Sequence, residues 1–440
     1  MRLSAAEIAA VTDGELIGAD VTVEGATQDS RAVMPGQLFV PVVADRDGHD
    51  FIADAFVAGA AATFTSRSDV IDGPAIRVAD TTQAVQRLAV HARRRMGNAS
   101  VIGVTGSAGK TSTKDLLAAV LGRAGPTHAS ERSFNNELGV PLTLVNAPDG
   151  VAAVVVEMGM RGPGQITELC AIASPSMAVV TTVGLAHTSE LGSIEAVARA
   201  KGEIVDGLPA EGWAVLNAEV PLVMAMAERT SAQVVTFGVD TGEVRAESVH
   251  TADDLTSRFR LLSPWGSAEV RLGARGAHNV ANACAAAAAA LAAGAGMSAV
   301  VAGLAEPSMS PWRMDLVTTP GGALVINDSY NANPMSMASA LRSLAALPVQ
   351  RRVAVLGLMA ELGDESEAAH QQIAQQAQDL GIDVIAVDAP YPGERCVSDR
   401  NEALSALAEW GELDDEVGVL VKGSRVAGLE QLVDELVSEG

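Results

Sequence analysis

The sequence predicts an α/β protein of three domains, built largely on parallel sheets. The first observation is the length of 440 residues, at roughly 100–200 residues per domain. The second is that short apolar strands alternate with helical segments from residue 101 onward, which is typical of a doubly wound parallel sheet. The third is the segment Glu-Pro-Ser-Met-Ser-Pro at 306–311, whose two prolines indicate a linker. We therefore expect domains at 1–98, 99–310 and 311–440.

The first domain is expected to be small and mixed α/β. Its predicted elements are a helix at 4–11, strands at 21–23 and 37–41, and helices at 50–59 and 83–96. The last helix ends in three consecutive arginines, which suits the negative end of a helix dipole.

The second and third blocks share one pattern. The second block has apolar strands at 101–105, 152–156 and 178–183, with a glycine-rich turn and a helix from Thr111 after the first of them. The third block has strands at 324–327, 353–356, 384–387 and 417–421, with helices at 336–344 and 368–380. An alanine- and glycine-rich run at 284–297 is too short to span a bilayer and predicts a closely packed core helix.

Composition excludes several classes of function. The 30 basic and 54 acidic residues give a net charge of −24, which opposes binding to nucleic acid or to anionic membranes. The three cysteines are widely separated, so we expect no disulfide scaffold and a reducing compartment. The first residues lack the apolar core of a signal peptide. We expect a cytoplasmic protein without membrane insertion.

The strongest local signal is the string GVTGSAGKT at 103–111. A strand, a glycine-rich turn and Lys-Thr at a helix start form the context of a phosphate-binding loop for ATP or GTP. Lys110 would reach the β- and γ-phosphates, and the Thr111 hydroxyl would bind Mg²⁺. Val104 stands where the standard loop has its first glycine. The remaining candidate phosphate-binding residues are Thr105, Gly106, Ser107, Ala108 and Gly109.

Two further polar side chains follow buried strands. Glu157 ends the string VVVE, and His187 follows the string VVTTVGLA. Because ligands bind at the carboxyl ends of strands in open α/β sheets, these residues should lie beside Lys110 and Thr111. Carboxylate and imidazole ligands around phosphate predict a Mg²⁺ or Mn²⁺ site. Composition alone makes Lys201 a surface lysine on a helix.

Eight strings in the chain together carry a family resemblance. In chain order they are TGSAGKTSTKD, NNELGVPLTL (135–144), VVVEMGM, AHTSELGS with AKGEI (186–204), GAHNVANACAA (276–286), WRMD (312–315), DSYNANP (328–334) and KGSR (422–425). Over essentially its whole length the chain resembles the Mur ligases, ATP-dependent ligases of peptidoglycan precursor synthesis. Within the family, the string DSYNANP is similar to that of the subtype that adds D-alanyl-D-alanine to a UDP-N-acetylmuramoyl-tripeptide.

The resemblance implies a UDP-binding domain, a central ATPase domain and a C-terminal domain that is similar to a dinucleotide fold. It implies an acyl-phosphate intermediate, two Mg²⁺ ions at Thr111, Glu157 and His187, and a carbamylated Lys201 as a further anionic group. It also implies a role in peptidoglycan synthesis, cell shape and cell division, and we expect a monomer. The site residues it adds are Asn279, Arg313 and Asp328 for ATP, and Ser30, Arg31, Asn135, Asn136, Tyr330 and Asn331 for substrates, with Lys422 and Arg425 as carboxylate contacts.

Three positions depart from the subtype pattern, namely Asn327, Met335 and Leu358. Two alternatives to this function stay open: a folylpolyglutamate synthase-like ligase of the same superfamily, and a phosphate-loop switch that ligates nothing. The sequence does not distinguish lysine from diaminopimelate in the tripeptide.

Overall fold

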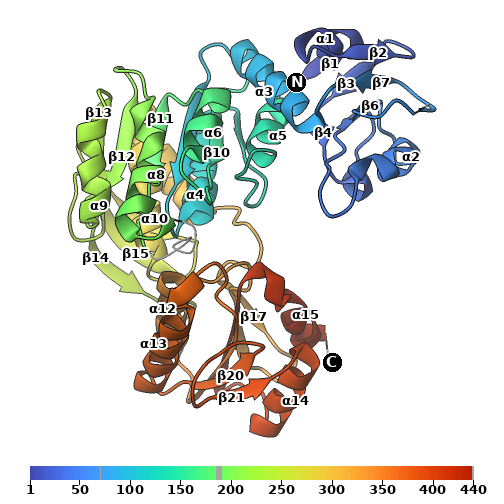
Figure 1. Cartoon of the computed structure of the whole chain (residues 1–440). Coiled ribbons are helices and arrows are strands. Elements are labelled where there is room, and N and C mark those ends of the chain that lie inside the picture. Colours follow the sequence, from blue (N-terminus) through green and yellow to red (C-terminus); the bar gives the residue numbers. More distant parts are fainter. Residues whose placement is uncertain (70, 185–190, 439–440) are drawn as a thin grey trace.

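The computed structural model describes residues 1–69, 71–184 and 191–438, and these form three α/β domains in chain order (Figure 1). The N-terminal, central and C-terminal groups of elements are each organised around a sheet of their own. This confirms the predicted fold class. The boundaries expected at residues 98 and 310 stay predictions.

The N-terminal domain contains a five-stranded sheet in the order β2-β7-β6-β5-β4, in which only β2 runs antiparallel to its neighbour. A separate pair, β1 and β3, is antiparallel. Helix α1 begins with a capping box in which the Ser4 side chain and the Glu7 side chain bond each other's backbone. The strands are β1 (Arg2–Ser4), β2 (Glu15–Ile17), β3 (Thr22–Glu24), β4 (Ala26–Thr27), β5 (Leu38–Phe39), β6 (Ala62–Thr65) and β7 (Ala75–Arg77), and the helices are α1 (Ala5–Val11), α2 (Ile52–Val57) and α3 (Thr81–Arg95).

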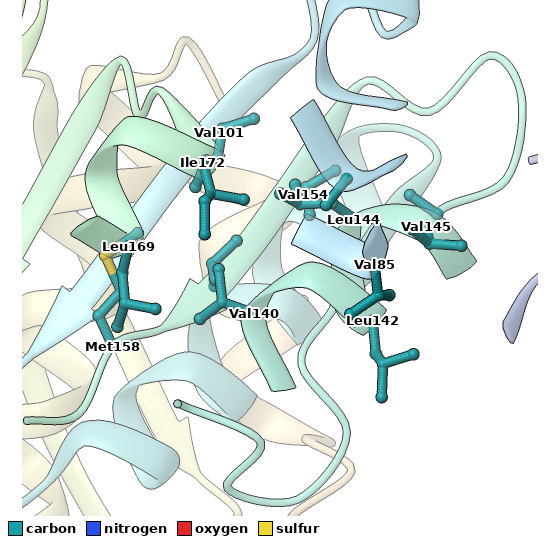
Figure 2. Close-up of a cluster of buried hydrophobic side chains, with 14 of the residues drawn as sticks. Val85, Val101, Val140, Leu142, Leu144, Val145, Val154, Met158, Leu169 and Ile172 are labelled. Atoms are coloured by element: carbon teal, nitrogen blue, oxygen red, sulfur yellow. The ribbon is translucent and has the colours of Figure 1, made fainter. Parts of the chain in front are cut away.

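Helix α3 joins the N-terminal and central domains through a shared hydrophobic core (Figure 2). It packs against α5 (Gly139–Asn146) and α6 (Gln165–Ala173), and Val85 of α3 belongs to the same hydrophobic cluster as Leu142, Leu144 and Val145 of α5. Burying one such side chain stabilises the fold by about 1.5–3 kcal/mol. The two domains are therefore held together by apolar packing along this helix.

The central domain carries a six-stranded, fully parallel sheet in the order β13-β12-β11-β8-β10-β9. The chain order reverses at β8, which lies between β10 and β11. Such a switch point is where open α/β sheets bind ligands. The strands are β8 (Ser100–Thr105), β9 (Thr127–Ala129), β10 (Ala153–Glu157), β11 (Met177–Val180), β12 (Trp213–Asn217) and β13 (Gln233–Phe237).

A three-stranded antiparallel sheet follows the parallel one, and the sequence pattern does not predict it. It consists of β14 (Arg245–Thr251), β15 (Ser257–Ser263) and β16 (Gly266–Leu272). We expected this stretch to continue the alternation of strands and helices. Its alternating exposed and buried positions along β15 are instead typical of a hairpin with one solvent face.

Three helices cover one side of the central sheet around the alanine run. Helices α10 (Asn279–Ala292) and α11 (Met297–Ala305) pack on α4 (Lys110–Ala124), and the alanines of α10 from Ala285 to Ala290 are fully buried. The prediction of a closely packed core helix is confirmed. A Cβ on Gly303 would overlap Val120 of α4, so the small residue sets the distance between α4 and α11.

The C-terminal domain has a six-stranded sheet in the order β17-β18-β22-β19-β20-β21, parallel except for β17. Its strands are β17 (Asp315–Thr318), β18 (Leu324–Asn327), β19 (Arg351–Gly357), β20 (Asp383–Val387), β21 (Arg395–Val397) and β22 (Val417–Lys422). Its helices are α12 (Pro334–Ala345), α13 (Ser366–Asp379), α14 (Arg400–Trp410) and α15 (Glu430–Ser438). Across the described ranges, no helix combines the length and the apolar character that crossing a bilayer requires.

Candidate active site

The phosphate loop lies at the carboxyl end of β8 and leads directly into α4. Gly106 and Gly109 have φ angles of +151° and +80°, which side chains other than glycine rarely adopt. A Cβ at Gly106 would overlap Thr181 Oγ1, and a Cβ at Gly109 would overlap Asn282 Oδ1. Both glycines are therefore required by conformation and by space.

Lys110 folds back over the loop. Its Nζ donates to the carbonyl of Gly106 at 2.7 Å, and burial lowers the pKa of this lysine. The amide of Ser107 donates to the Thr182 carbonyl at 2.9 Å, and the amide of Ala108 donates to Thr182 Oγ1 at 3.1 Å. Thr182 lies in the segment after β11, so a neighbouring strand end holds the loop in shape.

Glu157 is the last residue of β10 and pairs in register with Val104 of β8. Its carboxylate accepts hydrogen bonds from Thr111 Oγ1 and from Asn135 Nδ2, each at 2.8 Å. Thr111 Oγ1 in turn accepts a bond from Arg313 Nη2 at 2.9 Å. Four predicted site residues from four separate segments thus meet at one buried point.

The oxygen atoms at this point fit a magnesium ion. Within the described ranges, no cluster of three or more His, Cys, Asp or Glu side chains could hold a metal. Mg²⁺ does not need such a cluster, because it is usually bound by one or two carboxylates together with substrate phosphates and water. Glu157 and Thr111 supply a carboxylate and a hydroxyl beside the phosphate loop.

Lys201 is only 1% exposed, in contrast to its first interpretation as a surface lysine. It lies on α8 (Ile194–Asp206). Burial, and secondly the charge of Lys110, hold the pKa of Lys201 well below its usual value. The amine is therefore biased to its neutral form. His187 lies outside the described residues.

The C-terminal domain reaches the phosphate loop directly. Asn333 Nδ2 donates to the carbonyl of Ser107 at 3.2 Å, and the Tyr330 hydroxyl contacts Ser133 Oγ. Asp328, Tyr330 and Asn331 line the same cavity as Lys110 and Glu157. This cavity, about 400 Å³ in volume, is thus built jointly by the central and C-terminal domains.

The turn directly after the linker, at residues 312–314, carries Arg313 between two residues with strained backbone angles. Trp312 and Met314, on either side of Arg313, have φ angles of +61° and +59°, a region that costs non-glycine residues about 1–2 kcal/mol each. The Arg313 guanidinium lies 4.4 Å from the centre of the Tyr330 ring, and Tyr330 stacks on Trp312 at 6.4 Å. Arg425 covers Trp312 at 4.5 Å. Four flat groups therefore form one continuous stack.

Lys422 anchors the loop after β18. Its Nζ donates to Asp328 Oδ2 at 2.6 Å and to the carbonyl of Asn331 at 2.8 Å, and the lysine is 1% exposed. Lys422 lines the same cavity as Asp328 and Asn331, and through these bonds it supports residues 328–331. Arg425 pairs with Glu430 at 2.8 Å as well as covering Trp312.

A second cavity, about 1060 Å³ in volume, lies between the N-terminal and central domains. Asp29 and Ala32 line it, whereas Ser30 and Arg31 between them do not. Arg31 is exposed and makes a two-point ion pair with Asp29, with both N–O distances at 2.9 Å.

Two other predicted residues have structural partners of their own. Asn279 donates to the Arg275 carbonyl at 2.6 Å and accepts from Asn282. Its neighbours His278 and Asn282, rather than Asn279 itself, line the cavity between the central and C-terminal domains. Asn136 Oδ1 accepts from the amide of Gly139 at 2.9 Å at the start of α5.

The three departures from the subtype pattern lie in different surroundings. Asn327 is buried and accepts a bond from Ser329 Oγ at 2.6 Å, which shapes the turn after β18. Met335 lines the joint cavity, and a Cβ on Gly184 would overlap its sulfur. The Leu358 carbonyl accepts from the Ser424 amide at 2.9 Å.

Several residues that contact the site are absent from the set predicted above. Thr182, His278, Asn282 and Asn333 belong to strings that were noted, and the strand-end rule could have found Thr182. Ser133 gave no signal, because its contact with Tyr330 depends on the relative placement of two domains.

The fold and the site together define a multidomain enzyme that uses a nucleoside triphosphate. Residues 104–290 match the Mur ligase middle domain, and residues 312–425 match the Mur ligase glutamate ligase domain. The chain therefore belongs to the Mur ligase family, whose members are ATP-dependent ligases that form amide bonds.

The chain is similar to several relatives along nearly its whole length. It is 37% identical to UDP-N-acetylmuramoyl-tripeptide–D-alanyl-D-alanine ligase of Escherichia coli, with 98% of this chain and 97% of the relative covered. The ligase of the same name from Bacillus subtilis is 34% identical, with 94% and 93% covered.

Solved structures give the same picture. A crystal structure of MurF from Acinetobacter baumannii has a TM-score of 0.89 at 29% identity, covering 100% of this chain and 99% of that one. MurF ligase from Thermotoga maritima, solved in complex with ADP, has a TM-score of 0.80 at 27% identity, covering 95% and 98%.

Proposed function

We propose that this chain joins D-alanyl-D-alanine to UDP-N-acetylmuramoyl-tripeptide, with conversion of ATP to ADP and phosphate. The product is the UDP-N-acetylmuramoyl-pentapeptide of peptidoglycan synthesis. The observation that carries the proposal is the joint cavity, in which the phosphate loop faces Asp328, Tyr330 and Asn331 of the C-terminal domain. The names of the relatives, at 34–37% identity over nearly the full chain, supply the substrates.

The reaction needs positive charge between two anions. An oxygen of the tripeptide's terminal carboxylate attacks the γ-phosphorus of ATP, the bond to the β-phosphate oxygen breaks, and ADP leaves. The amine of D-alanyl-D-alanine then attacks the acyl carbon, loses a proton, and displaces phosphate. Lys110 and Arg313 provide cationic side chains, and the start of α4 provides backbone N–H groups at the place where phosphate charge builds up.

Glu157 and Thr111 are the residues that would hold a magnesium ion. When bound, Mg²⁺ supplies neutralisation of the phosphate charge and orientation of the transferred group. Asn135 fixes the second carboxylate oxygen of Glu157, so that the first faces Thr111. We also propose a second Mg²⁺ ion, held by His187 and Lys201.

We further propose that Lys201 is carbamylated. Its low pKa leaves a neutral amine, which is the form that reacts with CO₂. The resulting carbamate would carry one negative charge near Lys110 and would place oxygen acceptors beside a metal. An ammonium group at the same place would repel a divalent cation.

The remaining assignments follow the two cavities. The nucleotide would contact residues 105–111, Arg313 and Asp328, with Asn279 acting through its bond to the cavity-lining Asn282. The peptide end would lie near Asn135, Tyr330 and Asn331. The uridine part would lie in the second cavity beside Asp29, with Ser30 and Arg31 at its edge and Asn136 supporting α5. A monomer, a cytoplasmic location and the absence of nucleic-acid binding remain predictions.

One assay separates this function from its alternatives. Purified protein with ATP should release phosphate only when both UDP-N-acetylmuramoyl-tripeptide and D-alanyl-D-alanine are present. A folylpolyglutamate-type ligase would respond to a folate and glutamate instead, and a phosphate-loop switch would hydrolyse ATP without either acceptor. Phosphate release that ignores D-alanyl-D-alanine would contradict the proposal.

A further inference from the structure

Next to the phosphate loop, α4 carries a buried ion pair that the proposed chemistry does not use. Lys114 and Asp115 follow Lys110 by one turn, and Lys114 Nζ lies 2.8 Å from Asp115 Oδ1. Their side chains are only 2% and 8% exposed. Because removing two charges from water is costly, a buried ion pair does not by itself stabilise a fold. The contacts of the two side chains indicate another role.

Each member of the pair reaches a different segment of the site. Lys114 Nζ donates to the carbonyls of Ser130 and Arg132, at 2.8 and 2.6 Å, so its three protons have three acceptors. That segment continues to Ser133 and Asn135, which contact Tyr330 and Glu157.

Asp115 reaches the linker between the central and C-terminal domains. Its Oδ2 accepts a hydrogen bond from the amide of Ser310 at 2.8 Å. Ser310 lies three residues before Arg313, at the entrance to the turn in which Trp312 and Met314 hold strained φ angles. On the other side of that turn, Asp315 Oδ2 accepts from the Trp312 amide at 2.6 Å.

A strained backbone persists only where its surroundings hold it in place. Without the bond to Asp115, we expect residues 310–314 to relax and the Arg313 guanidinium to leave its position 2.9 Å from Thr111 Oγ1. A displacement of about 1 Å of a group that must meet a phosphate in the transition state is costly in rate.

We propose that Asp115, paired with Lys114, is a positioning residue that ties the linker to the phosphate-loop helix and thereby places Arg313 on the reacting phosphate. Lys114 completes the device by holding the segment 130–135 to the same turn of α4. This inference rests on the proposed function, because Arg313 has its role only where ATP is used.

The chain offers a matched control. Arg123 at the other end of α4 pairs with Glu306 at the start of the linker, at 3.1 Å, and both side chains are well exposed. This pair joins the same helix to the same linker but lies far from the loop in sequence. Exposed pairs of this kind contribute about 0–1 kcal/mol.

The test is a double-mutant cycle in kcat. Asp115→Ala should lower kcat about tenfold in the native background and less than about twofold in the Arg313→Ala background, because the two changes remove one effect. The ADP dissociation constant, measured by calorimetry, should change less than about threefold, since Lys110 and the loop glycines are intact. Glu306→Gln should leave kcat within about twofold of the native value.

A charge-free version of the pair supplies the rescue. Lys114→Gln with Asp115→Asn retains amide donors and an acceptor for Ser310, so kcat should return to within about threefold of the native value. This variant also carries the test if Asp115→Ala does not fold. The inference is overturned if Asp115→Ala costs as much in the Arg313→Ala background, or if the charge-free variant folds and stays as slow as Asp115→Ala. A native protein that releases no phosphate with both acceptors would contradict the proposed function instead.

Discussion

Lys422 and Asp328 lie at the carboxyl ends of two neighbouring parallel strands, β22 and β18, and their side chains meet at 2.6 Å. The same strand-end geometry brings Glu157 of β10 beside the phosphate loop after β8. In both domains, therefore, the carboxyl ends of neighbouring parallel strands supply residues that line the joint cavity.

Replacing Lys422, the buried partner of Asp328, should destabilise the C-terminal domain. Lys422→Met leaves the Asp328 carboxylate and the Asn331 carbonyl without their donor, and breaking a buried pair costs about 3–5 kcal/mol. Urea unfolding measures this loss. Arg395→Ala, which breaks the exposed pair with Glu409, should change the free energy of unfolding by less than about 1 kcal/mol. Equal losses in the two variants would refute the assignment.

Lys110→Ala should abolish ligation in a folded protein. Loss of a charge that contacts the transferred phosphate costs about 3 kcal/mol or more, which is at least about a hundredfold in kcat. The assay is phosphate release at saturating ATP, with circular dichroism as the check on folding. Turnover near the native value would exclude Lys110 from the reaction.

Lys201→Ala should be nearly inactive, and native activity should fall in CO₂-free buffer and return with bicarbonate. Because the neutral amine captures CO₂, protonation of Lys201 removes the carbamate, and activity should decrease as the pH is lowered. Lys201→Glu should recover part of the activity. The exposed Glu195→Gln on the same helix serves as control. An unbranched lysine side chain in a metal- and nucleotide-bound crystal near pH 8 would disprove the modification.

Two glycine substitutions on facing helices should act in opposite directions. Gly303→Ala on α11 forces a methyl group against the Val120 backbone and should destabilise the fold by about 1–3 kcal/mol. Gly122→Ala on α4 meets open space and should stabilise it by about 0.5–1 kcal/mol, because alanine favours a helix. Thermal unfolding compares them, and a stabilised Gly303→Ala would mean that α4 and α11 are less closely packed.

Local patterns predicted much of the fold. The predicted strand at 324–327 has the bounds that the structure shows, because the three apolar residues Leu324, Val325 and Ile326, followed by Asn327 at a turn, form a short buried strand. The antiparallel strands β14–β16 were not predicted, because polar residues on their solvent face interrupt every apolar run in this stretch.

The site residues that follow the ends of strands could be predicted from the sequence, whereas those that depend on the packing of helices or on the contact between domains could not. Glu157, Lys110 and Thr111 follow from neighbouring strands of one sheet. The bond from Arg313 to Thr111 joins residues 202 positions apart and depends on how the linker turns between two domains. The burial of Lys201 was likewise invisible, because a lysine on a helix carries no local sign of what covers it.

The stack of Arg425, Trp312, Tyr330 and Arg313 has an optical consequence. The chain has only four tryptophans and two tyrosines. One of each, Trp312 and Tyr330, lies next to the contact between the central and C-terminal domains. Trp213 and Trp265 form a separate pair in the central domain. Indole emission responds to a cation over its ring and to water at its edge, and Trp312 has the Arg425 guanidinium over its ring next to the contact between the two domains. A change in the contact between the two domains should therefore alter the intrinsic fluorescence of the protein, without an added label.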